Sequence, residues 1–381
     1  MTPIIVTADE ARRRHVTVAD YASCSLAFID CKKPGSHLKQ NFSIIGAGVT
    51  QSSDQVVNIQ EPHGFSLGAA AMPHGITNNL HIHYTAEVFM IYSGDWVFRW
   101  GDNDADGEIA GSAGDVVSVP TWIFRGFKNT GADDGFIFTA LGGDDTGGII
   151  WHPEIVKEAG TFGLYLTREN MMVDTTTGAE RPADRDLMPL ISDVDRASLR
   201  KYSVAEMRSR VVAAQERQWS RSALLCSVLP DHAVEFAPAI GYGMSEDRNA
   251  TPRITNPHGF SIEWLRLPPG QTLGRHRIAA KQAIMVFAGY AELTLNDQSD
   301  RVTVPLAPKE TYSVPGSAWR ALTNRGTATV EIAIITATDG KKPIEWAPEI
   351  LRAARAAGFA LDHNGYVAPL HLLPMSVQMA S

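Results

Sequence analysis

The chain has 381 residues, of which 44% are hydrophobic and 20% are charged, a composition typical of soluble globular proteins. Its net charge of -8 at pH 7 argues against a surface that binds nucleic acid. No apolar run approaches the roughly 20 residues that span a bilayer, and the first residues lack the apolar stretch of a signal peptide. We therefore expect a cytoplasmic protein with no nucleic-acid or membrane partner.

An internal repeat organises the chain. The sequence EPHGFS at residues 61–66 returns as NPHGFS at residues 256–261, an offset of 195 residues that internal duplication explains. The two copies cover residues 24–165 and 219–360, and each is long enough to bury a hydrophobic core. The predicted organisation is an N-terminal arm (1–23), a first unit (24–165), a linker (166–218), a second unit (219–370) and a C-terminal tail (371–381).

Short strands dominate each copy. The segments EVFMIYSGDWVFRWGDN, from residue 87, and QAIMVFAGYAELTLNDQ, from residue 282, each contain two runs of aromatic and β-branched residues around a short turn, which predicts a hairpin. Many such strands with Gly-rich turns predict a sandwich or small barrel. The segments that begin with Pro153 and Pro348 predict one short helix per copy. In the linker, Ser203 and Glu206 form a capping pattern that predicts a helix over 204–218.

The first copy contains three candidate metal ligands, His81, His83 and Glu87, in the pattern G-x5-H-x-H-x3-E-x6-G. Residues two apart on a strand point to the same face, so both imidazoles face the same cavity, and Glu87 can reach it from the same or the next strand. Two nitrogens and one carboxylate with open positions are the arrangement associated with non-haem Fe(II), although Mn, Ni, Co or Zn can also occupy it. The sequence therefore predicts a divalent metal site in the first unit.

The second copy retains only one of these ligands. His276 is preserved, but Ile278 and Gln282 stand where the second His and the Glu are expected. Isoleucine offers no ligand atom and glutamine offers no negative charge. We therefore expect the second unit to bind no metal.

These patterns resemble the cupin superfamily, and the two copies resemble a bicupin. The second motif of that superfamily, G-x5-P-x-G-x2-H-x3-N, is matched by Gly114, Pro120 and Asn129, whereas Trp122 replaces the inner Gly and Arg125 replaces the His. The resemblance implies an all-β fold of two tandem jelly-roll barrels with short helices and a partly helical linker. The motif is also similar to that of bicupin dioxygenases that open aromatic rings, such as gentisate dioxygenase, which commonly use three histidines.

Arg125 stands at the third histidine position but has no lone pair to offer a metal. Three roles for it remain open. It binds a substrate carboxylate or enolate beside a three-ligand metal, it forms an ion pair with Glu87 that leaves the pocket metal-free, or it turns outward and either caps a carbonyl or packs over Trp122. Arg320 lies at the same register of the second copy, which favours a structural reason for the arginine.

The resemblance implies a metal-dependent oxidoreductase of the dioxygenase type that acts on a small anionic substrate, either aromatic or enolisable. Glu87 and Arg125 are then the expected catalytic residues, and Trp122, Phe89 and Phe127 are the expected pocket residues. Two alternatives remain open, namely a cupin metalloenzyme without O2 chemistry (isomerase, cyclase or lyase) and a non-catalytic bicupin that binds a small molecule. The resemblance also implies a homodimer or higher oligomer.

Overall fold

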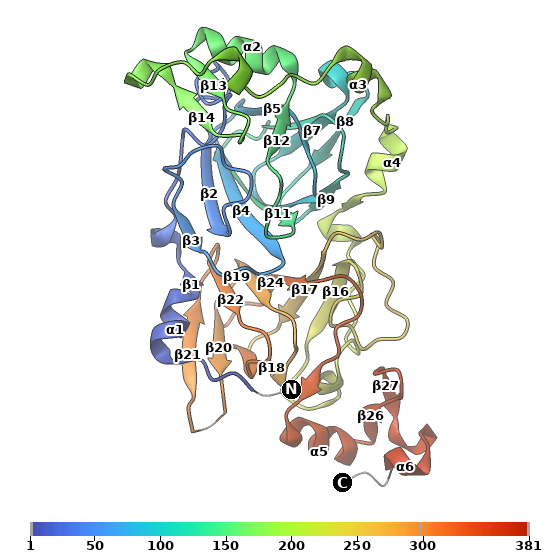
Figure 1. Ribbon diagram of the computed structural model, residues 1–381. Coiled ribbons are helices and arrows are strands. Elements are labelled where there is room, and N and C mark those ends of the chain that lie inside the picture. The colour runs from blue at the N-terminus through green and yellow to red at the C-terminus, as the bar shows by residue number, and fades with distance from the viewer. Residues whose placement is uncertain (1–2, 298, 379–381) are drawn as a thin grey trace. The chain divides into compact units, whose positions relative to one another are not determined.

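The computed structural model describes residues 3–297 and 299–378 (Figure 1). The chain divides into two compact units, one formed by residues 20–215 and the other by residues 1–19 together with 216–381. Strands dominate both units and the helices are short, so the all-β prediction is confirmed. No helix in the described ranges is both long enough and apolar enough to cross a membrane.

The unit of residues 20–215 contains two facing sheets. The larger sheet comprises, in order of pairing, β15 (Val211–Val212), β9 (Val116–Val119), β6 (Glu87–Ser93), β11 (Gly135–Gly142), β4 (Phe65–Met72), β2 (Gln40–Ile45) and β3 (Val57–Ile59). The smaller sheet comprises β12 (Ile149–Trp151), β5 (Thr77–His83), β10 (Arg125–Asn129), β7 (Trp96–Trp100) and β8 (Gly107–Gly111). The pairing is antiparallel except between β2 and β3.

The second unit repeats this plan. Its larger sheet comprises β1 (His15–Val16), β22 (Thr311–Val314), β19 (Gln282–Ala288), β24 (Val330–Ala337), β17 (Phe260–Leu267) and β16 (Glu235–Ile240). Its smaller sheet comprises β21 (Val302–Leu306), β20 (Ala291–Leu295), β23 (Arg320–Asn324), β18 (Thr272–Arg277) and β25 (Glu345–Trp346). Each barrel is followed by a two-stranded ribbon, β13 (Leu164–Leu166) with β14 (Met172–Asp174) and β26 (Phe359–Leu361) with β27 (Val367–Pro369).

The two predicted hairpins are wrong, although all four strands exist. β6 pairs with β9 and β11, whereas β7 pairs with β8 and β10, so the turn at residues 94–95 carries the chain from one sheet to the other. Gly94 has a φ of 88°, and a Cβ there would lie 2.8 Å from the Cα of Gly135. A jelly roll alternates consecutive strands between sheets, and local turn composition does not reveal that alternation.

The two predicted post-barrel helices are confirmed as α2 (Pro153–Thr161) and α5 (Pro348–Ala356), each with proline in its first turn. In the linker, Ser203 and Glu206 form the predicted capping box of α4 (Val204–Arg208). The helix was expected to continue to residue 218, but it ends early because Val211 and Val212 are buried as an edge strand against β9. The remaining α-helices are α1 (Ala8–Arg13), α3 (Asp193–Ser198) and α6 (Met375–Gln378).

The segment that precedes each barrel is also repeated. α1 and β1 correspond to α4 and β15, and each segment extends a sheet in the same way: Arg14 accepts a hydrogen bond from Ser313, and Arg210 accepts one from Ser118. α1 and β1 therefore complete the second barrel, whereas β15 completes the first. This relation is hard to find in the sequence because its offset is 196 residues, between 14 and 210, rather than 195.

Candidate metal centre

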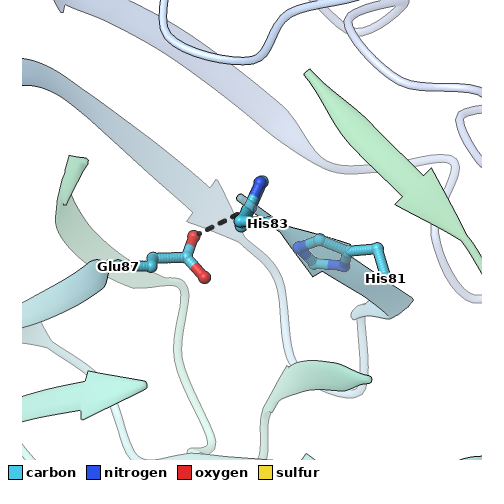
Figure 2. Close-up of side chains that lie close together, drawn as sticks. All are labelled: His81, His83 and Glu87. Atoms are coloured by element: carbon cyan, nitrogen blue, oxygen red, sulfur yellow. Dashed lines mark ion pairs between the residues drawn. The ribbon is translucent and has the colours of Figure 1, made fainter. Parts of the chain in front are cut away.

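The structure brings His81, His83 and Glu87 together inside the first barrel (Figure 2). Both histidines lie at the end of β5, and Glu87 is the first residue of β6, so the two strand ends that flank the turn between the sheets supply all three side chains. The three side chains are buried, and their ligand atoms lie within 4.8 Å of one another. Among the described residues, no other group of three His, Cys, Asp or Glu side chains meets this geometry.

His81 is held in one tautomer by the backbone. Its Nδ1 lies 2.6 Å from the carbonyl oxygen of Asn79, so Nδ1 carries the proton and donates it to that oxygen. Nε2 consequently keeps its lone pair. In metal-binding histidines, a hydrogen bond from the ring nitrogen that does not bind the metal fixes the orientation of the ring. His81 therefore fits a ligand role.

The protonation states of the cluster also fit a cation. Burial lowers the pKa of His81 well below its ordinary value, and burial together with the Arg125 charge lowers the pKa of His83. Burial opposes ionisation of Glu87, but its interactions with His83 and with the Arg125 charge outweigh burial and hold the pKa of Glu87 well below its ordinary value. At neutral pH the cluster therefore contains two neutral imidazoles and one carboxylate, which are the forms that bind metal.

Arg125 contacts Glu87 rather than solvent. Its Nε donates to Glu87 Oε2 over 3.1 Å, and its Nη1 lies 3.4 Å and 3.3 Å from the carbonyl oxygens of His81 and Ile123. Only 2% of its side chain is exposed, so it does not turn outward. The other carboxylate oxygen, Oε1, lies 3.5 Å from Nε2 of His83. The ion pair therefore occupies one oxygen of Glu87 and leaves the other directed toward the histidines.

A cavity of about 80 Å³ adjoins the cluster, and the three candidate ligands form part of its wall. Four aromatic side chains also line it, namely Phe28, Phe42, Phe127 and Trp151. Small and aliphatic residues form much of the rest, and polar side chains contribute as well, among them Asn41, Ser43, Gln55, Ser66, Asn78 and Thr139. Arg125 is not part of this wall, and its guanidinium is bonded to Glu87.

Of the three expected pocket residues, the structure places only Phe127 in the cavity wall. Phe89 is fully buried in the barrel core, where its ring lies 4.9 Å from those of Phe98 and Phe127. Trp122 lies in the turn between β9 and β10, is 48% exposed and packs against Tyr84. Neither Phe89 nor Trp122 therefore lines the cavity, which corrects the expectation from the sequence.

Sequence reasoning missed several residues of the cavity wall. Phe28, Phe42 and Asn78 belong to no recognisable motif, so no signal pointed to them. Trp151 could have been found, because it is repeated as Trp346 in the second copy. Its ring lies 5.2 Å from that of His81, and the ring of Trp346 lies 5.5 Å from that of His276.

Several solved structures are similar to this chain over most of its length. Oxalate decarboxylase of Lactobacillus farciminis aligns with a TM-score of 0.53 at 12% identity, covering 90% of this chain and 92% of its own. The 7S globulin of Momordica charantia aligns with a TM-score of 0.54 at 11% identity, covering 88% and 86%. Vicilin from Capsicum annuum aligns with a TM-score of 0.53 at 10% identity, covering 88% of each chain.

The chain has the bicupin fold. The tandem jelly-roll prediction is thereby confirmed, whereas identities of 10–12% carry the similarity no further than the fold. No protein-family model matches the chain, and no curated protein sequence matches it.

The second barrel retains the arginine and one histidine of the cluster but has no carboxylate at the position of Glu87. Arg320 donates from Nη2 to Gln282 Oε1 over 2.7 Å, whereas Arg125 donates from Nε to Glu87. His276 Nδ1 lies 2.8 Å from the carbonyl oxygen of Gly274, and burial lowers the pKa of His276 to about 3. The buried carboxyl of Glu263 occupies the position that corresponds to Gly68 in the cavity wall of the first cupin barrel. The second barrel therefore repeats the arginine contact in a site that lacks two of the three ligands.

Proposed function

We propose that the protein is a metal-dependent oxidoreductase of the bicupin dioxygenase type that acts on a small anionic organic substrate. The observation that carries the proposal is the buried cluster of His81, His83 and Glu87 at the wall of a cavity. Two imidazoles and one carboxylate that occupy one side of an ion are characteristic of Fe(II) oxygenases. Fe(II) is accordingly the proposed metal, with Mn, Ni, Co or Zn as competitors.

Bound Fe(II) would supply redox chemistry and a positive charge beside the substrate. His81, oriented by the Asn79 carbonyl, and His83 would hold it together with Oε1 of Glu87. Arg125 is a positioning residue in this proposal, because it fixes Glu87 through Oε2 and lies outside the cavity wall. The ion pair of Arg125 with Glu87, which was one of the three roles open for the arginine, is thus compatible with a metal site of three ligands.

The proposed substrate is small, because it has to fit the cavity beside the cluster. Aromatic rings from Phe28 and Trp151 suit a planar substrate, and the polar side chains of the wall suit its oxygen atoms. A gentisate-like aromatic acid is the more specific proposal, in accordance with the motif resemblance. Oxalate decarboxylase is among the structural neighbours, which makes a small dicarboxylate the second choice.

Metal analysis is the first test of this proposal. Protein purified without chelator or nickel affinity resin is expected to contain close to one metal ion per chain, or to take up one Fe(II) under anaerobic conditions. Glu87→Ala should lower metal content and activity together, whereas Gln282→Ala, at the equivalent position of the second barrel, should change neither. Absence of metal after Fe(II) loading, or full metal content and turnover in Glu87→Ala, would refute the site.

The competing function is non-redox metal chemistry, in which the ion acts as a Lewis acid for a lyase, isomerase or cyclase. The structural similarity to oxalate decarboxylase favours this alternative, because decarboxylation is a lyase reaction. Turnover measured without O2 separates the two, because a dioxygenase consumes O2 in proportion to product and a lyase does not. A binding protein without turnover, suggested by the similarity to 7S globulin and vicilin, predicts ligand binding but no product.

We also propose that the protein forms a homodimer or a higher oligomer. Analytical ultracentrifugation of the full chain tests this, and a single species with the mass of one 41.4 kDa chain at micromolar concentration would exclude it.

A further inference from the structure

A β-bulge brings Asn78 to the face of β5 that carries the two histidines. Arg125 pairs with His81 and Phe127 pairs with Asn78, so two steps along β10 oppose three steps along β5. Residues two apart on a strand share a face, and the extra residue of the bulge therefore turns Asn78 to the side of His81. Asn78 is 5% exposed and forms part of the cavity wall.

Lys39 fixes the amide of Asn78 in one orientation. The ammonium group lies 2.5 Å from Oδ1 of Asn78 and 2.5 Å from Oδ1 of Asp30. An ammonium group can only donate hydrogen bonds, so the amide atom that it contacts is the oxygen. The amide nitrogen of Asn78 is therefore on the opposite side, 3.5 Å from Nδ1 of His81.

The amide nitrogen of Asn78 has donors to offer to the cavity. His81 Nδ1 already carries a proton that it donates to Asn79, so it has no lone pair for the amide of Asn78. This long approach to His81 is the only contact of Asn78 Nδ2 within the described ranges. The Lys39 charge on the amide oxygen polarises the group and strengthens its N–H donors.

The second barrel shows that the fold does not require these charges. Leu273 stands at the position of Asn78, Val234 at that of Lys39, and Leu225 at that of Asp30. All of the substituted side chains are buried and belong to the hydrophobic core. Replacing a buried ion pair by packed apolar groups is often neutral or stabilising, so barrel stability by itself does not require the pair of Lys39 and Asp30.

We propose that Asn78 is a substrate-binding residue that donates a hydrogen bond to a carboxylate oxygen of the ligand, and that Lys39 and Asp30 are positioning residues that orient its amide. A carboxylate only accepts hydrogen bonds, and it complements the polarised N–H groups of Asn78. That this ligand is the substrate of a metal-dependent reaction rests on the proposed function. The binding of a small carboxylate at Asn78 does not depend on the proposed function.

Titration calorimetry with oxalate, benzoate and 2,5-dihydroxybenzoate tests the proposal on metal-free protein and on protein loaded with Mn(II). Asn78→Leu, which copies the second barrel, should weaken binding of the best probe by about tenfold or more, because a hydrogen bond to a charged group is lost. Asn78→Asp should weaken it further by charge repulsion. Leu273→Val, at the equivalent position of the second barrel, is the control and should bind like the wild type.

Metal uptake, measured separately, keeps this proposal apart from the proposed function. Asn78→Leu should retain the wild-type metal content because Asn78 is not a ligand. A wild-type protein that takes up no metal but binds a carboxylate through Asn78 supports this inference and refutes the proposed function. Binding within twofold of the wild type in Asn78→Leu, or no binding of any probe by the wild type, would overturn the inference.

The roles of Lys39 and Asp30 are tested together, because either charge alone would remain buried without its partner. The double variant Lys39→Met with Asp30→Asn should bind the best probe several-fold more weakly while its melting temperature stays at or above that of the wild type. In the Asn78→Leu background the same double change should have no further effect on binding. An equal loss in both backgrounds would show that the pair does not act through Asn78.

Discussion

Arg125→Met is expected to make the stability of the first barrel depend on metal. Arg125 and Glu87 form an ion pair over 3.1 Å, and their side chains are 2% and 5% exposed. Removing one partner of such a pair costs about 3–5 kcal/mol because the other charge stays desolvated. In a domain of this size 1 kcal/mol corresponds to about 2–4 °C, so the metal-free variant should melt roughly 6–20 °C lower than the wild type.

A divalent cation should reverse much of this loss, because it replaces the guanidinium as the counter-charge of Glu87. Calorimetry at pH 7.5 with and without Mn(II) measures the effect, and the rise in melting temperature with metal should be larger in Arg125→Met than in the wild type. Arg320→Met is the matched control, since Arg320 contacts the uncharged amide of Gln282. Its melting temperature should fall less and should not respond to metal. A loss in Arg125→Met that Mn(II) leaves unchanged would refute the three-ligand site.

Glu263 should make the second barrel less stable at alkaline pH. Burial raises its pKa from 4.5 to about 7, so its contribution to stability is complete below pH 4.5 and is lost as pH rises through 7. Glu263→Gln, which mimics the protonated form, should match the wild type near pH 4.5 and exceed it by about 3 kcal/mol at pH 8 in denaturant titrations; an equal pH dependence in both proteins would contradict this. His276→Ala should leave metal content per chain unchanged, because Ile278 and Gln282 complete no ligand set, and a halved content in elemental analysis would show that the second barrel binds metal. Trp122 has a φ of 56°, so Trp122→Gly should keep or raise stability by up to about 1 kcal/mol and leave the affinity for carboxylates unchanged. A tenfold loss of affinity in that variant would return Trp122 to the substrate pocket.

Local patterns predicted the features that depend on near neighbours in the chain. The capping box of Ser203 and Glu206 and the proline starts of α2 and α5 lie within one or two turns, and the structure contains all of them. Features that depend on distant pairing were predicted less well. The turn after β6 has the composition of a hairpin, but long-range pairing places β6 and β7 in different sheets. The linker helix ends at Arg208 for the same reason, since the edge of β9 takes up the next residues.

The sequence by itself determined the duplication and the identity of the three candidate ligands, because both are encoded by spacing along the chain, and the resemblance of the motifs to those of cupins implied the jelly-roll class. Only the tertiary structure decided what surrounds those ligands. Burial and the 3.1 Å contact assign Arg125 to Glu87, and the bulge in β5 turns Asn78 toward the cavity. Phe89 and Trp122 lie outside the cavity wall although they are close to the motifs in sequence. The wall combines residues from strands that are far apart in the chain, and spacing along the chain carries no information about that combination.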